Sequence, residues 1–167
     1  MKEFSAHWST SLRLISILTT IVLLVVAYFI YPTSPPWGRF AAAFSLLVLV
    51  GSLLFTIRGY ALDPNTKTLH IKRLFWNTTV SLEHLESATP DPEAMRNSIR
   101  LLGNGGLYSF SGIFRNEQLG TFRSFVTNPK HCVVLKFASE KPIVVSPTDR
   151  PDFLELVRTR LANNETR

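Results

Sequence analysis

The feature that most constrains this chain is a long stretch near its beginning that carries almost no charge. Between Arg13 and Arg58 the only charged residue is Arg39. This leaves two apolar runs, residues 14–31 and 40–57, on either side of a short proline-rich segment. The second run has 18 residues, and a helix of that length is about 27 Å long, close to the ~30 Å hydrocarbon core of a bilayer. Both runs are apolar on every side, whereas a helix packed on a soluble core needs only one apolar face.

We therefore predict a transmembrane hairpin with spans at about residues 13–31 and 40–57. A cleaved signal peptide fits poorly, because residues 28–31 at the end of the first run are too large for a cleavage site. A hairpin buried in a soluble core also fits poorly, because the remaining 110 residues are too few to enclose two such helices. The chain then divides into a hairpin at 1–57, a globular domain at 58–162 and a disordered tail at 163–167.

The globular part offers little for catalysis. From Arg58 onward it has 15 Lys and Arg against 11 Asp and Glu, too mild a basic excess for a nucleic-acid-binding surface. Its single cysteine, Cys132, excludes an internal disulfide and fits a reducing compartment. Cys132 directly follows His131, so on a strand their side chains point to opposite faces and do not chelate one metal ion. We expect no catalytic residue, no metal site and no cofactor, and hence a protein that is not an enzyme.

Beyond the second run the apolar residues follow a period of two, which indicates β-strands. In residues 69–76, for example, Leu69, Ile71 and Arg73 share one face. Similar runs predict strands at 55–62, 69–76, 79–85, 98–102, 121–126, 131–137 and 142–145. A helix capped by Asp149 follows, and its apolar stripe consists of Phe153, Leu154, Val157 and Leu161. These elements predict a small β-sandwich or partly open barrel that the final helix caps.

Five short motifs lie between residues 112 and 147. They are GIFRN at 112–116, LGTF at 119–122, FVTN at 125–128, VVL at 133–135 and IVVSP at 143–147, which leads into the helix at Asp152 and Phe153. Together they resemble the bacterial pleckstrin-homology-like (bacterial PH) domain family, in particular members with an N-terminal transmembrane hairpin. The resemblance covers about Thr56 to Leu161. It implies a non-enzymatic module with seven strands in a strongly bent, all-β sheet pair and a C-terminal α-helix across one corner.

The segment from Gly103 to Gly120 is rich in glycine, serine and aromatic residues. It lacks the Lys and the Ser or Thr that follow the last glycine of a phosphate-binding loop. We expect a long connection that either exposes a partner surface or folds back over the domain core. The candidate partner-surface residues are Leu107, Tyr108, Phe110, Phe114, Arg115 and Arg123. Candidates for contact with anionic headgroups or an acidic partner are Arg96, Arg100, Arg115 and Arg123, although the turn at 62–66 lacks the basic cluster of inositide-binding PH domains.

Together, the residues and the resemblance predict a non-catalytic, membrane-anchored PH-like module. We expect a protein-binding or self-assembling platform at the cytoplasmic face of the bacterial inner membrane, with a protein partner or further copies of itself and no nucleic acid. Two alternatives stay open. One is an accessory or regulatory subunit of a membrane enzyme or transporter, and the other is a module that binds anionic lipid.

The positions of Lys and Arg predict how the hairpin crosses the membrane. They flank the two outer ends of the hairpin, whereas the connecting loop has only Arg39, which favours both termini in the cytoplasm. A reporter enzyme that is active only in the cytoplasm, fused after Arg167, should therefore be active. If only a reporter specific for the opposite compartment works at this position, the orientation is reversed.

Overall fold

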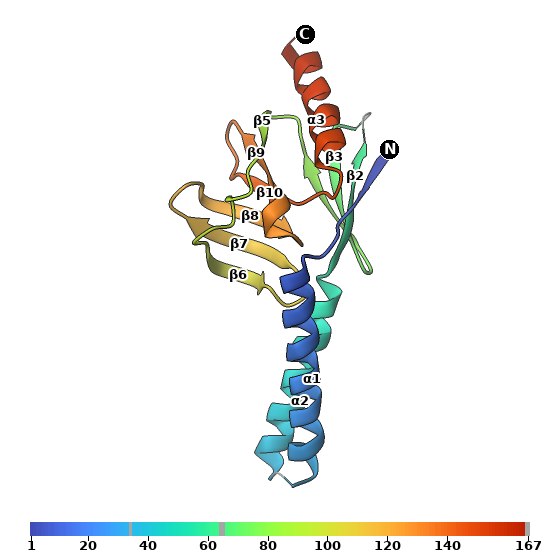
Figure 1. Ribbon diagram of the computed structural model, residues 1–167, viewed down its shortest axis with the longest axis vertical. Coiled ribbons are helices and arrows are strands. Elements are labelled where there is room, and N and C mark those ends of the chain that lie inside the picture. The colour runs from blue at the N-terminus through green and yellow to red at the C-terminus, as the bar shows by residue number, and fades with distance from the viewer. Residues whose placement is uncertain (34, 64–65, 166–167) are drawn as a thin grey trace.

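The computed structural model describes residues 1–33, 35–63 and 66–165, and Figure 1 shows a helical hairpin below a β-rich domain. The hairpin consists of α1 (Thr10–Thr33) and α2 (Pro36–Leu54). Both helices are long and apolar enough to cross a membrane, with mean hydropathies of 2.3 over Thr10–Phe29 and 1.7 over Pro36–Leu54. Only 11% of each apolar stretch is buried inside the protein, unlike the core helix of a soluble protein. The two apolar helices predicted from the sequence are confirmed.

The domain contains two sheets and a C-terminal helix. The first sheet has the order β1 (Lys2–Ser5), β2 (Ile57–Asp63), β3 (Thr68–Arg73), β4 (Asn77–Ser81). The second has the order β5 (Leu85–Pro90), β9 (Val133–Phe137), β10 (Ile143–Val145), β8 (Gly120–Val126), β7 (Phe110–Asn116), β6 (Ile99–Gly105), and a short 3₁₀ turn, η1 (Pro129–His131), precedes β9. The described residues thus form ten strands rather than the seven that the resemblance implies. Two sheets, neither closed into a barrel, and the final helix α3 (Arg150–Glu165) confirm the expected fold class.

Two clusters of buried apolar side chains hold the domain together. The larger cluster joins the two sheets and α3, and it includes Ile71, Leu135 and Phe153. The smaller cluster consists of residues of the second sheet and of the connections between its strands, and it includes Phe122 and Val134. Neighbouring residues of β9 therefore enter different clusters, which buries both faces of that strand. This explains why β9 is almost continuously apolar instead of alternating.

The final helix begins where the sequence predicts. The Asp149 carbonyl oxygen accepts a hydrogen bond from the Phe153 amide at 3.1 Å. Phe153, Leu154 and Val157 are buried as expected, whereas the side chain of Leu161 lies outside the described residues. The helix continues to Glu165 and so includes the first residues of the segment expected to be disordered. Residues 166–167 lie outside the described part of the chain.

The chain enters and leaves the helical hairpin through the same sheet. β1 precedes α1 and pairs with β2, which follows α2, from Lys2 opposite Leu62 to Ser5 opposite Gly59. The strands approach closely, because a Cβ on Gly59 would lie 2.7 Å from the Phe4 carbonyl oxygen. β1 was not predicted, because its four residues are too few for a period-two pattern.

The segment from Gly103 to Gly120 is not the long connection expected from its composition. It forms the end of β6, a short turn and all of β7, which pairs with β8. Gly103 and Gly112 lie opposite each other with φ values of +105° and +145°, and a Cβ on either would clash with the backbone of the other strand. Glycine is therefore required at this crossing. Its low strand propensity concealed the hairpin in the sequence.

Tyr60 of β2 joins the two sheets through a buried hydroxyl group, which donates to the Phe125 carbonyl oxygen at 2.6 Å and accepts from the Ser146 amide at 3.1 Å. Because these partners would lose their hydrogen bonds, Tyr60→Phe should lower the free energy of unfolding by about 1–3 kcal/mol. Thermal unfolding of the full chain in mild detergent measures this loss. An unchanged unfolding temperature would contradict it.

The wild-type protein and the Tyr60→Phe variant also test how the stability depends on pH. Burial raises the pKa of Tyr60 to about 12 from its ordinary value of 10.0. The stability due to its neutral form is therefore complete below pH 10.0 and is lost as the pH rises towards 12. The stability difference between the wild-type protein and Tyr60→Phe should shrink over that interval.

Candidate functional site

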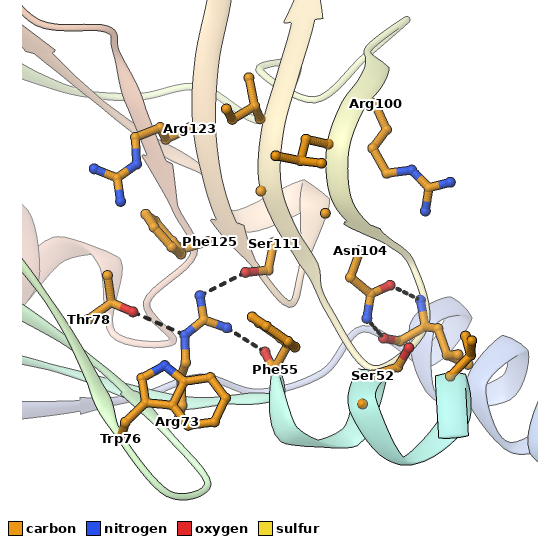
Figure 2. A pocket seen from close by; sticks show the side chains of 17 residues that line it. Ser52, Phe55, Arg73, Trp76, Thr78, Arg100, Asn104, Ser111, Arg123 and Phe125 are labelled. Atoms are coloured by element: carbon orange, nitrogen blue, oxygen red, sulfur yellow. Dashed lines mark hydrogen bonds between the residues drawn. The ribbon is translucent and has the colours of Figure 1, made fainter. Parts of the chain in front are cut away.

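A cavity of about 820 Å³ lies where the end of α2 meets the two sheets (Figure 2). Its walls come from residues 48–55 at the end of α2, from the region of the β3–β4 turn, and from β6, β7 and β8. The apolar helix α2 and the two sheets of the domain therefore both contribute walls to the cavity. Three arginine side chains, Arg73, Arg100 and Arg123, are among its lining residues.

Arg73, at the end of β3, joins three parts of the protein (Figure 2). Its Nη1 donates to the Phe55 carbonyl oxygen at the end of α2 (2.8 Å), and its Nε donates to Thr78 Oγ1 on β4 (3.1 Å). Its Nη2 donates to Ser111 Oγ on β7 (2.9 Å). All three acceptors are uncharged groups. These bonds fix the guanidinium group in place but leave its charge uncompensated.

Aromatic rings complete the surroundings of Arg73. Its guanidinium carbon lies 5.4 Å from the ring centre of Phe55, 5.9 Å from that of Trp76 and 5.5 Å from that of Phe125. Such contacts stabilise a cation that is shielded from water. Arg73 is only 8% exposed, and this burial lowers the pKa of its guanidinium, with the nearby charge of Arg123 acting in the same direction. An arginine still stays charged at neutral pH.

Two further arginines face the same cavity. Arg123 on β8 lies 5.3 Å from the ring centre of Phe125, and Figure 2 shows this ring between Arg123 and Arg73. Arg100 on β6 lines the wall contributed by the β6–β7 hairpin. No Asp or Glu lines the cavity in the part of the chain that the structure describes, and none of the three arginines forms an ion pair there. An anion in the cavity would therefore offset an uncompensated positive charge.

The β6–β7 turn fixes this wall of the cavity to the helical hairpin. The Leu107 amide donates to Asn104 Oδ1 at 3.1 Å, and the Asn104 side-chain amide donates to the Leu107 carbonyl oxygen. The next residue, Tyr108, reaches α1: its amide donates to Ser16 Oγ at 2.9 Å and its hydroxyl group lies 2.6 Å from Thr20 Oγ1. These contacts of Tyr108 therefore link the β6–β7 turn of the domain directly to α1 of the helical hairpin.

The six residues considered for a partner surface lie in different environments. Tyr108 and Phe114 are 6% and 3% exposed, so their side chains are not available to a partner. Leu107 and Arg123 line the cavity. Phe110 and Arg115, both on β7, lie outside the cavity. A docking role for the residues that are not buried stays a prediction.

Arg73 was not among the candidate residues predicted from the sequence, although a signal for it exists. Arg73 is in phase with Leu69 and Ile71 on β3, and both of these are fully buried. A charged residue at a position where the strand pattern requires an apolar one indicates a buried cation with a specific role. Of the arginines that were considered, Arg100 and Arg123 reach the cavity, whereas Arg96 pairs with Glu93 at 3.0 Å.

The His and Cys residues do not form a reactive centre in the described part of the chain. No group of three or more His, Cys, Asp and Glu residues lies together there in a way that could hold a metal ion. Cys132 is fully buried, and burial raises the pKa of its thiol to about 12, so it is a poor nucleophile at neutral pH. His131 lies on the exposed surface at the end of η1.

Comparison with known proteins identifies the family. A family model described as the bacterial PH domain matches residues 59–161, which run from β2 through most of α3. No curated protein and no solved structure gives a significant match. The match covers more than half of the chain and coincides with the two sheets and their final helix. The chain therefore belongs to the bacterial PH domain family.

Proposed function

We propose that this protein is a membrane-anchored, non-catalytic module that binds an anionic lipid in the cavity beside α2. The hairpin spans the bacterial inner membrane as a two-pass anchor, and the PH domain and both termini lie in the cytoplasm. The observation that carries this proposal is that Arg73, Arg100 and Arg123 all line a cavity that no described acidic residue lines.

The chemistry of the cavity fits a phosphate-bearing headgroup. A positive charge held away from water is costly unless an anion pairs with it. Guanidinium groups bind phosphate oxygens through charge-assisted hydrogen bonds, which are among the stronger hydrogen bonds in proteins. Arg73 supplies a fixed charge inside the cavity, and Arg123 supplies a more exposed charge on β8 of the second sheet. A phosphate in the cavity would offset the repulsion of the two cations.

The position of the cavity fits a lipid better than a soluble phosphate compound. Val48 and Gly51 line the cavity and belong to the apolar stretch of α2. With α2 in the membrane, the cavity lies at the boundary between the hydrocarbon core and the headgroups. An acyl chain can then follow the apolar surface of α2 while the phosphate reaches the arginines. Ile113 and Leu102 add apolar surface to the domain wall.

The platform and accessory-subunit roles predicted from the sequence are compatible with this fold but have weaker support. Tyr108 and Phe114, two of the six residues predicted for the candidate partner surface, are buried. No contact between described residues favours a particular protein partner. The cavity, in contrast, has a defined shape, charge and location, so we place lipid binding first.

Arg123→Gln should weaken the binding of an anionic phospholipid by a factor of about ten or more. A hydrogen bond to a charged group contributes about 1.5–3 kcal/mol, and about 1.4 kcal/mol corresponds to a tenfold change in affinity. The affinity is measured by titrating the purified full chain in mild detergent with phosphatidylglycerol that carries a fluorescent acyl chain. Arg115→Gln is the matched control, because it removes the same charge from an exposed position on β7 outside the cavity.

Two controls separate this site from nonspecific attraction. An equal loss of affinity in Arg123→Gln and Arg115→Gln would mean that net charge alone attracts the lipid, and it would contradict the proposal. Phosphatidylcholine and inorganic phosphate should not displace the fluorescent lipid at matched concentrations. Displacement by inorganic phosphate would assign the cavity to a soluble phosphate compound instead.

A further inference from the structure

The exposed apolar side chains of the domain gather on one side of it. Outside the helices, the described residues with exposed large hydrophobic side chains are Met1 and six others: Phe55, Phe75, Trp76, Ile99, Leu101 and Leu102. We call these six residues the apolar rim. Ile99, Leu102 and Phe75 are 69%, 67% and 75% exposed, respectively. A group of this kind on a folded domain indicates a surface that something covers.

The apolar rim is shared by the two sheets and borders the helical hairpin. Phe75 and Trp76 form the β3–β4 turn of the first sheet, and residues 99–102 lie on β6, the edge strand of the second. Trp76 and Leu102 line the cavity together with Val48 of α2. Figure 1 shows β6 as the strand of its sheet that lies nearest to the hairpin. The rim therefore extends outward from the apolar helix on both sides of the cavity.

We propose that the apolar rim docks on the surface of the bilayer, so that the PH domain lies against the membrane instead of projecting from it. This inference rests on the membrane insertion of the hairpin and is independent of lipid binding in the cavity. The composition of the region suits the interface. Trp76 is an aromatic residue of the type found at headgroup level, and the exposed Arg13, Arg58 and Arg100 add positive charge that anionic lipids attract.

The bilayer explains the apolar rim better than a second copy of the chain does. A second copy could add a strand to the free edge of β6, because edge strands present unpaired backbone groups. That pairing would cover residues 99–102 but would leave Phe75 and Trp76 of the other sheet in water. A bilayer surface that surrounds the hairpin contacts both sheets at once. It also continues the apolar surface that α2 already presents.

The test measures how close the rim lies to lipid. The full chain is reconstituted in vesicles of phosphatidylcholine and phosphatidylglycerol after labelling a single introduced cysteine with a fluorophore. Leu101→Cys and Phe75→Cys each place the label on one sheet, at side chains whose exposure makes the substitutions harmless to folding. Glu140→Cys is the matched control, in the exposed β9–β10 connection. The wild-type protein serves as the blank, because Cys132 is fully buried.

Phospholipids brominated near the headgroup end of the acyl chains should quench the labels at 101 and 75 by about half, because interfacial side chains reach that depth. The label at 140 should keep its fluorescence. No quenching at 101 and 75, or equal quenching at all three sites, would overturn the inference. Energy transfer between labels at 101 on different copies, with no quenching at 75, would also overturn it and would assign the β6 edge to self-assembly.

Discussion

The hydrogen bonds of Arg73 connect all the parts that meet at the candidate site. One guanidinium group binds the carbonyl end of α2 through Phe55, the first sheet through Thr78 and the second sheet through Ser111. The contact at Phe55 is also favourable because cations stabilise the negative end of a helix dipole. An apolar side chain at this position would leave the Phe55 carbonyl and the Ser111 hydroxyl without this donor. The geometry of the cavity therefore depends on a charge that the protein itself does not neutralise.

Further contacts fix the position of the two sheets, and so of the cavity, relative to the helices. The chain enters α1 from β1 and returns from α2 into β2, and these two strands pair with each other. Tyr108 adds a contact between the β6–β7 turn and α1 at Ser16 and Thr20. The hairpin is thus not a flexible tether, because both sheets contact it at separate points.

The sequence predicts the parts of this fold that depend on repeated patterns. The two apolar helices follow from the scarcity of charge between Arg13 and Arg58, and the alternation in β3 follows from its period of two. Such patterns do not predict the β6–β7 hairpin, because Gly103 and Gly112 are required by a close approach of the two strand backbones, which is visible only in the structure. They do not predict the cavity either, since Arg73, Arg100 and Arg123 come from three strands in different parts of the chain.

The sequence of residues 62–66 bears on where the domain could bind a headgroup. These residues lack a basic cluster, which argues against headgroup binding by this segment. The positive charge of the described cavity instead lies beside α2, where the helix supplies an apolar wall that an isolated PH domain lacks. A domain that the hairpin anchors in the membrane, as proposed, does not need a headgroup site for recruitment. On the proposed function, charge at the junction with the hairpin suits the sensing of the surrounding lipids, because a lipid bound there would contact both sheets and the helix.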